Sequence, residues 1–151
     1  MKKTALLTTL TALFLVSQAD AQSCMANVKK NGLTVGTSPD YPPYESLNEK
    51  NEIVGFDIDL INAVAKKMGV KVKVVGQGFD GLIPALISKK IDVIAAGMTV
   101  TAERKKAVNF TLPYDNSANV IMARKENLKY ASAASLAGKN VGSQIGTVQE
   151  K

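Results

Sequence analysis

Several residue types on which enzymes and metal sites depend are missing or rare in this chain. It contains no histidine, no tryptophan and a single cysteine among 151 residues. The lack of imidazole excludes a histidine metal cage and any catalytic base of that type. A single cysteine excludes an internal disulfide and a thiolate zinc cluster. Much of enzyme chemistry is excluded with these residue types. We expect no metal, no cofactor and no catalytic residue in this chain.

The composition is that of a soluble globular chain, with 46% hydrophobic and 21% charged residues. Neither a disordered nor a fibrous protein has this balance. The formal net charge is +6, but the lysines form scattered pairs with few aromatic residues among them. Since nucleic-acid binding gathers basic and aromatic residues on one surface, we expect no nucleic-acid partner. The pairs are Lys29-Lys30, Lys66-Lys67, Lys89-Lys90 and Lys105-Lys106.

The amino terminus has the pattern of a secretory signal peptide. Two lysines precede an apolar run over residues 5–16, and Ala19 and Ala21 then frame an A-x-A cleavage site. The run is shorter than the ~20 residues that a transmembrane helix needs. The pattern therefore predicts removal of residues 1–21 and export to the periplasm. A buried amino-terminal helix is the alternative.

Cys24 allows another interpretation of the same region. The small residue Ser23 precedes it, as at sites where a cysteine becomes the lipidated first residue of the mature protein. The leucine expected three places before such a cysteine is Ala21 here. A lipoprotein anchored through Cys24 is therefore less favoured than simple cleavage.

Beyond the amino terminus, strand patterns alternate with helix patterns. The clearest helix starts at Asp57, carries one apolar stripe and stops at Gly69, whose backbone freedom suits a helix end. This alternation predicts the α/β class, with a parallel sheet and right-handed crossovers. The predicted elements are strand 33–36, helix 57–68, strand 71–75, helix 82–88 and strand 91–96.

Asp57 and Asp59 both stand at the start of the predicted helix. Side chains at positions i and i+2 point apart on a helix, so these two do not form a carboxylate pair. Negative charge in the first turn is favourable to the helix dipole. We interpret both residues as capping residues.

Ligands of parallel α/β sheets bind beyond the carboxyl ends of the strands. Those ends lead here into loops 37–44, 76–80 and 97–101. Prolines force the first loop into extended or turning backbone.

Three of the few aromatic residues, Tyr41, Tyr44 and Phe79, fall in these loops. Aromatic rings in such places enclose the apolar stem of a ligand or contact a cation. Core packing is the alternative for Tyr44 and Phe79.

Arg104 is a candidate clamp for a carboxylate. Thr101 has the residue type of a helix N-cap, which places Arg104 in the first helical turn. A cation there opposes the helix dipole unless it meets an anion, and a guanidinium fork matches a carboxylate. The alternative is that Arg104 belongs to an exposed charged run over residues 103–106. Thr99 is either a ligand contact or a simple turn former.

Four strings, in this order and at this spacing, carry a family resemblance. They are residues 36–45 (GTSPDYPPYE), 55–60 (GFDIDL), 79–86 (FDGLIPAL) and 96–104 (AGMTVTAER). Together they resemble the periplasmic polar amino-acid-binding proteins of ABC importers. The resemblance implies two α/β lobes of the periplasmic-binding-protein fold, which close as a monomer on one amino acid. It also implies delivery to a membrane permease, without catalysis.

The resemblance implies roles for individual residues. Arg104 would grip the α-carboxylate of the ligand, while the Gly97 carbonyl and the Thr99 hydroxyl would take its α-ammonium. Tyr41 and Phe79 would flank the ligand side chain. The implied ligand-binding residues are Tyr41, Tyr44, Phe79, Ala96, Gly97, Thr99, Arg104, Gln144, Thr147 and Val148.

The same resemblance divides the chain into units. The N–H groups of Thr147 and Val148, at a helix start in the second lobe, would add a second hold on the carboxylate. Gln144 would face the ligand side chain. The implied units are a first lobe over 22–118, a hinge strand over 119–124 and the start of a second lobe over 125–151.

Two features depart from the family pattern. Ser38 stands where many relatives that bind basic or amide ligands carry an aspartate. The sequence stops at Lys151, where the family continues into most of a second lobe, so we expect weak binding by this chain alone. The bound amino acid stays open, although Asp40 and Glu45 favour arginine, lysine or glutamine.

Two other functions use the same scaffold. A periplasmic dehydratase of cyclic acids, similar to cyclohexadienyl dehydratase, needs a proton donor near the ligand. The loops of this chain offer none with a clear role. A sensor domain would require a transmembrane segment encoded after the last residue.

Overall fold

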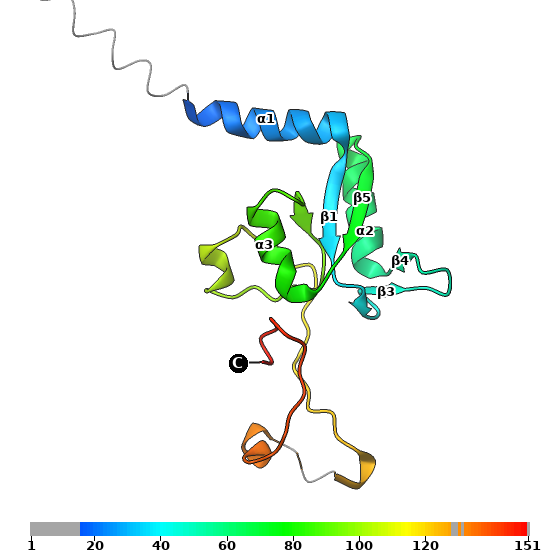
Figure 1. The fold of residues 1–151 in the computed structure, drawn as a ribbon, viewed down its shortest axis with the longest axis vertical. Coiled ribbons are helices and arrows are strands. Elements are labelled where there is room, and N and C mark those ends of the chain that lie inside the picture. The colour runs from blue at the N-terminus through cyan, green and yellow to red at the C-terminus, as the bar shows by residue number, and fades with distance from the viewer. Residues whose placement is uncertain (1–15, 128–129, 131, 151) are drawn as a thin grey trace, which may run out of the picture.

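The computed structural model describes residues 16–127, 130 and 132–150 (Figure 1). Most of the predicted signal peptide lies outside these residues. The described chain begins with helix α1 (Val16–Asn31), which crosses the predicted cleavage point after Ala21. Cleavage at that point stays a prediction. No helix in the described ranges is both long enough and apolar enough to cross a membrane.

The central sheet has parallel strands. β1 (Leu33–Thr37) lies in the middle, with β5 (Val72–Gly76) on one side and β6 (Val93–Ile94) on the other. Val35 in the middle strand pairs with residues of both neighbours. The predicted parallel α/β arrangement is confirmed, although the last strand is shorter than its sequence pattern.

Two helices join these strands and lie on opposite sides of the sheet (Figure 1). α2 (Phe56–Met68) comes between β1 and β5, and α3 (Leu82–Ile87) between β5 and β6. The chain steps in opposite directions across the sheet in these two crossovers, so right-handed connections place the helices on opposite faces. Gly69 ends α2 with a φ of 69°, which confirms the predicted left-handed stop.

The core has one hydrophobic cluster on each face of the sheet. Side chains alternate across a strand, so Val35 packs in the α2 cluster, whereas a Cβ on Gly36 would lie 2.4 Å from Ile91 Cδ1. Val28 of α1 is 3% exposed, which packs the second half of α1 on the lobe. The buried residues are Val28, Leu33, Val35 and Ala65 in one cluster and Leu82, Ala85, Ile91 and Ala96 in the other.

A second sheet, which is antiparallel, follows the first strand. β2 (Asp40–Tyr41), β3 (Glu45–Leu47) and β4 (Ile53–Val54) pair in this order. The predicted extended or turning backbone over residues 37–44 agrees with this, since residues 40–41 are extended and residues 42–44 form a turn, but the pairing of these segments into a sheet was not predicted. Strands of two or three residues are too short to show a period of two, so the sequence pattern does not reveal them.

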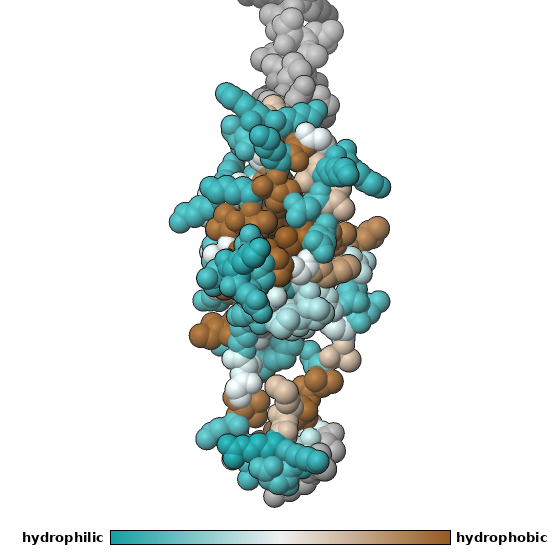
Figure 2. Space-filling view, turned by 90° about the vertical axis from the view of Figure 1, so that its right-hand side faces the viewer, coloured by the Kyte–Doolittle hydropathy of each residue, from teal (hydrophilic) through white to brown (hydrophobic). Residues whose placement is uncertain are grey.

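The chain beyond the lobe has little regular structure. It runs away from the sheet and returns to it (Figure 1), with short 3₁₀ turns at Lys125–Asn127 and Ala133–Leu136. The predicted hinge strand 119–124 pairs with no strand in the described part of the chain. Figure 2 shows exposed hydrophobic side chains in this lower part, where Met122 is 94% exposed. The boundaries of the units stay predictions.

Candidate amino-acid site

The predicted loops meet at the carboxyl edge of the parallel sheet. Tyr41 and Tyr44 stack with ring centroids 5.1 Å apart and an interplanar angle of 16°. A Cβ on Gly97 would lie 3.0 Å from the Tyr41 ring. Gly97 also has a φ of 50°, which favours glycine. The first and third loops therefore touch, and a larger residue at position 97 would have to displace the Tyr41 ring.

A hollow of about 250 Å³ opens beside these rings. Tyr41 is 45% exposed, so its ring is available to a ligand rather than buried in the core. The Tyr44 hydroxyl donates to Asp115, and this hydrogen bond is the main cause that raises the pKa of Tyr44 to about 12. The hollow is lined by Tyr41, Tyr44, Gly97, Met98, Thr99, Val100 and residues 110–117.

Arg104 turns toward the loops rather than into the exposed charged run. Its guanidinium donates to the Thr99 carbonyl at 2.7 Å and to the Gly146 carbonyl at 2.9 Å. The guanidinium carbon lies 5.3 Å from the centre of the Phe79 ring. Partial burial lowers the pKa of Arg104, because water is displaced from its charge.

The backbone around Arg104 agrees with the predicted cap. The Arg104 N–H donates to the Thr101 hydroxyl at 3.1 Å, as expected for a residue that caps a helical turn. The turn that follows is a 3₁₀ helix over Arg104–Lys106. Thr101 therefore fixes the start of this turn, and the turn aims the guanidinium at Phe79.

Two other predicted site residues differ in burial: Thr99 is exposed and Ala96 is buried. Thr99 is exposed, and its carbonyl accepts from Arg104. Ala96 is 2% exposed and packs in the core cluster of α3. Only the main chain of Ala96 is therefore available to a ligand.

The returning segment brings the predicted second-lobe residues to the same edge. Gln144 donates to the Asp40 carboxylate at 2.8 Å. Gly146 packs so closely that a Cβ on it would lie 2.9 Å from Asp80 Cα. Together with the bond to Arg104, these contacts place the segment over the first lobe, beside the predicted site.

The expected helix start in this segment is absent. The Thr147 N–H and its hydroxyl both donate to the Gln144 carbonyl, at 3.3 and 2.7 Å, within a turn. Val148, half-buried, follows in the same turn. The expectation that Thr147 and Val148 begin a helix is therefore wrong, because local hydrogen bonds close a turn instead. Their predicted contact with a carboxylate stays a prediction.

Asp57 corrects another sequence interpretation. It is 1% exposed and makes no cap. Its Oδ2 accepts from the Gly97 N–H and from the Tyr114 hydroxyl, each at 2.7 Å. Burial is the main cause that raises the pKa of Tyr114, followed by this hydrogen bond. A signal was present, since positions 57, 61 and 65 share one helix face and Asp57 continues the apolar stripe.

Glu45 is the second buried acid of this region. It is 0% exposed and so does not face the hollow, contrary to its interpretation as a contact for a basic ligand. Burial first, and then the charge of Asp57, raises the pKa of Glu45 to about 8. The alternation along β3 places its side chain inward, and only the unpredicted second sheet reveals that alternation.

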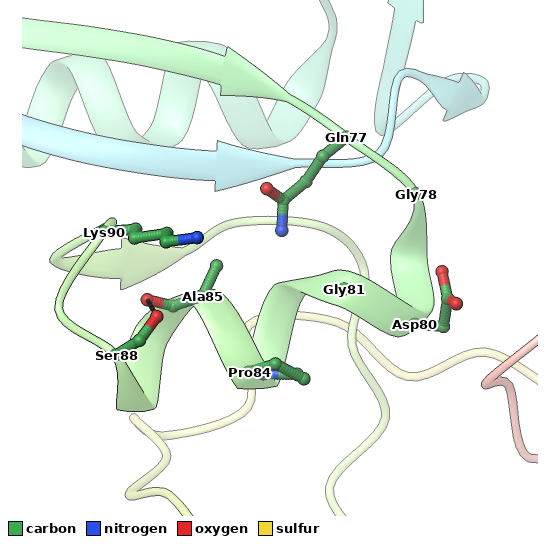
Figure 3. A pocket seen from close by; sticks show the side chains of 8 residues that line it. All are labelled: Gln77, Gly78, Asp80, Gly81, Pro84, Ala85, Ser88 and Lys90. Atoms are coloured by element: carbon green, nitrogen blue, oxygen red, sulfur yellow. Dashed lines mark hydrogen bonds between the residues drawn. The ribbon is translucent and has the colours of Figure 1, made fainter.

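A separate hollow of about 270 Å³ lies between the end of β5 and α3 (Figure 3). Gln77 points into this space, whereas Asp80 is directed away from it. Of the predicted binding residues, none lines it. Its lining residues are Gln77, Gly78, Asp80, Gly81, Pro84, Ala85, Ser88 and Lys90.

Metal ligands are not grouped in the described residues. No set of three or more histidine, cysteine, aspartate or glutamate side chains there is arranged to hold an ion. The chemistry available at the edge of the sheet is a guanidinium, aromatic faces, carboxylates and main-chain groups. This combination suits a small zwitterion.

Comparison with known families agrees with this chemistry. The sequence model of the bacterial extracellular solute-binding proteins, family 3, matches residues 33–142. The chain belongs to this family. It carries all four strings of the resemblance within or next to the matched residues, and its parallel sheet is the beginning of one lobe of the two-lobe fold.

Similar proteins are named for the amino acids that they bind. The chain is 43% identical over 156 residues to a probable histidine-binding protein of Campylobacter jejuni, covering 99% of this chain and 60% of the relative. It is also 43% identical to the ABC transporter arginine-binding protein 1 of Escherichia coli, covering 79% of this chain and 48% of that protein. The chain thus spans about half to three fifths of the length of these relatives.

One similar solved structure contains only the first domain of its protein. It is the arginine-bound form of domain 1 from the arginine-binding protein of T. maritima, with 54% sequence identity and a TM-score of 0.57. The match covers 58% of this chain and 71% of that one. The relative's first domain therefore holds arginine in the solved structure, without the rest of its protein.

Proposed function

We propose that the full-length protein is an extracytoplasmic receptor that captures a polar amino acid between two lobes and delivers it to an ABC permease. Membership of the family supports capture of a solute, and the named relatives support an amino acid. They favour a receptor over the dehydratase alternative. The receptor acts as a monomer, and its ligand and the membrane permease are its partners.

The position of Arg104 carries the proposal. Its guanidinium is partly buried against Phe79, and the hydrogen bonds given above join it to main-chain carbonyl oxygens. A carbonyl carries only a partial negative charge, so a ligand carboxylate that replaces Gly146 O gains a charge-assisted, two-pronged bond. Since burial has already removed water from the guanidinium, the anion restores the interaction that water supplied.

The surroundings of this clamp favour a cationic side chain in the ligand. The exposed face of Tyr41 attracts a cation, and the Asp40 carboxylate lies at the same edge. Relatives named for arginine and histidine agree with this charge. We infer that arginine or a similar cationic amino acid is the ligand.

A melting screen of the full-length protein tests the proposal. A ligand at a hundredfold excess over its Kd stabilises the folded protein by about 2.7 kcal/mol. We expect arginine, lysine or histidine to raise the melting temperature, and glutamate to have no effect. No shift with any of the common amino acids contradicts the proposal.

We further propose that the protein is exported by its signal peptide. Removal of residues 1–21 leaves Val28, so the packing of α1 on the lobe survives cleavage. The mass of the mature protein is then that of a chain starting at Gln22. A mature chain that starts at Cys24 and carries the mass of attached acyl groups supports the lipoprotein alternative instead.

A further inference from the structure

Two buried carboxyl groups lie against each other beneath the candidate site. Glu45 comes from β3 and is 0% exposed, and Asp57 comes from the first turn of α2 and is 1% exposed. Figure 1 shows β3 beside the start of α2, and the Asp57 N–H donates at 3.0 Å to the carbonyl of Tyr44, the residue before Glu45. Buried acids are rare in proteins unless a partner neutralises or shares their charge.

The donors around this pair are unevenly distributed. Asp57 Oδ2 accepts from the Gly97 N–H and from the Tyr114 hydroxyl. Asp57 Oδ1 and both oxygens of Glu45 accept no hydrogen bond from any group in the described part of the chain. Two ionised carboxylates repel each other and have no proton to share, so this arrangement is incompatible with two negative charges.

We propose that Glu45 and Asp57 share one proton, which Glu45 carries, and that the protonated pair positions the Gly97 loop at the ligand site. The Glu45 hydroxyl donates to Asp57 Oδ1, which is otherwise without a donor, while Gly97 and Tyr114 donate to Oδ2. The proton comes from solvent and returns to it when the pair opens. No other group changes its charge.

The groups that face Glu45 agree with this assignment. Burial has the largest effect on its pKa, and the carboxylates of Asp57 and Asp40 act in the same direction. Tyr114, on the segment packed over the pair, has its own pKa raised by burial and by Asp57, while its neighbour Asp115 binds the Tyr44 hydroxyl. Burial and the two carboxylates all favour a neutral Glu45 at neutral pH.

The pair joins three parts of the site. β3 continues the hairpin that carries Tyr41, α2 supplies Asp57, and the loop after β6 supplies Gly97. Gly97 in turn packs against the Tyr41 ring. Loss of the shared proton places a second negative charge beside Asp57, and the repulsion separates the hairpin from α2. We expect the Gly97 loop and the Tyr41 ring to move apart when this happens, so that the site loses its arrangement.

Infrared spectroscopy of the full-length protein tests the shared proton without any ligand. A protonated carboxyl group has a carbonyl stretch that an ionised one lacks. We expect this band at about pH 7, far above the ordinary pKa of a glutamate, and we expect E45Q to remove it. Full ionisation of all carboxyl groups of the unmodified protein at that pH overturns the proposal.

Arginine affinity tests the positioning role, which rests on the proposed function. We expect the unmodified protein to lose about tenfold in affinity between about pH 7 and pH 9.5, as one buried group with a raised pKa titrates. E45Q should bind with a flatter pH profile, because glutamine stays neutral. E49Q, at an exposed residue of the turn between β3 and β4, is the control and should keep the original profile.

The two experiments fail in different ways. Titration of arginine itself is common to all variants, so it cancels when their profiles are compared. If E45Q keeps the profile of the unmodified protein, the pair does not position the site and that part of the proposal is wrong. If no variant binds any amino acid, the proposed function is wrong, while the infrared band still decides whether the proton is shared.

Discussion

Gly97 shows how a single residue shapes the site. Its φ of 50° is left-handed, and the Tyr41 ring lies only 3.0 Å from the place of a Cβ. The backbone therefore needs glycine for two reasons, its conformation and the close approach of the ring. Its N–H also binds Asp57, so the loop is held from both sides.

G97A should destabilise the protein and weaken arginine binding. A left-handed φ costs a non-glycine residue about 1 kcal/mol, and displacement of the Tyr41 ring adds to this. G138A is the matched control, because Gly138 has a φ of 71° with nothing within 4 Å of a new Cβ. Urea unfolding measures both variants. Equal losses in the two variants would show that contact with Tyr41 contributes nothing.

R104K should weaken arginine binding by about ten- to hundredfold, the range for a lost hydrogen bond to a charged group. Lysine keeps the charge but has no planar fork to hold both a carboxylate and the Thr99 carbonyl. Calorimetry on the full-length protein measures the change. K105A, at the exposed neighbour, should leave affinity unchanged. Unaltered binding by R104K would remove Arg104 from the carboxylate site.

The raised pKa of Glu45 predicts how stability depends on pH. An unfolded glutamate releases its proton near its ordinary pKa of 4.5, whereas the folded protein holds this proton up to about pH 8. The contribution of Glu45 to stability is therefore complete below pH 4.5 and is lost as pH rises through 8. The slope approaches about 1.4 kcal/mol per pH unit for one proton.

Urea unfolding of the unmodified protein and of E45Q across this range isolates the effect, because other titrating groups are common to both. E45Q should show a smaller loss of stability with rising pH. Parallel profiles would mean that Glu45 ionises alike in the folded and unfolded protein.

At the scale of elements, the sequence pattern of α2 identifies its buried face only in part. Of the predicted apolar stripe, Ala65 is buried and Ile61 packs beside it, whereas Val64 and Met68 are 41% and 37% exposed. The helix ends at Gly69 as its sequence predicts.

α3 has only six residues, too few to show a clear helical period. It nevertheless supplies Leu82, which is 0% exposed. Its packing against β1 and β6 therefore holds it in place, since six residues do not form a stable helix alone.

L82A should cost about 2–5 kcal/mol of the free energy of unfolding, the usual range for a fully buried leucine. I87A on the same helix is the comparison, because Ile87 is 59% exposed and should matter far less. Thermal or urea unfolding measures both. A similar loss in the two variants would mean that α3 does not pack on the sheet as described.

Element types were easier to predict than element pairings. The strand at residues 33–37 and the helix at 56–68 follow local periods of two and 3.6 residues. The pairing of β2, β3 and β4 depends on which short segments meet, and no local period records this. The prediction therefore missed the hairpin that buries Glu45.

For the whole molecule, topology gathers lysines that are scattered in the sequence. In a parallel α/β lobe, the carboxyl ends of the helices and the amino ends of the strands meet at one edge. Exposed lysines occupy that edge. The candidate site, with Asp40, Asp57 and Asp80, lies at the opposite edge. The lysines are Lys29, Lys30, Lys66, Lys67, Lys71, Lys73, Lys89 and Lys90.

Brief trypsin treatment of the 151-residue chain should cut first at Arg124, Lys125 or Lys139. These residues are exposed and lie in segments that the lobe does not pack, and proteases prefer such backbone. Lys66 is also exposed but lies within α2, so cleavage there should be slower. Mass spectrometry of the early fragments identifies the sites. Cleavage at Lys66 as fast as at Arg124 would contradict the described arrangement.

The sequence by itself determined the α/β class, the order of helices and strands, and the loops that hold the ligand-binding candidates. These features depend on local hydrophobic periodicity and on the residue types that begin and end helices, and both are present in the sequence itself. The turn that Thr101 begins, the loop positions of Tyr41 and Tyr44, and Arg104 as a candidate clamp were all predicted in this way.

Only the tertiary structure decided what the acidic residues do. Asp57 looks like a capping residue and Glu45 like a surface acid until β3, α2 and the Gly97 loop are brought together. Their burial, and the shared proton that we infer from it, depend on contacts between residues far apart in the chain. The energy of a charge is set by what surrounds it in space, and local sequence does not contain that information.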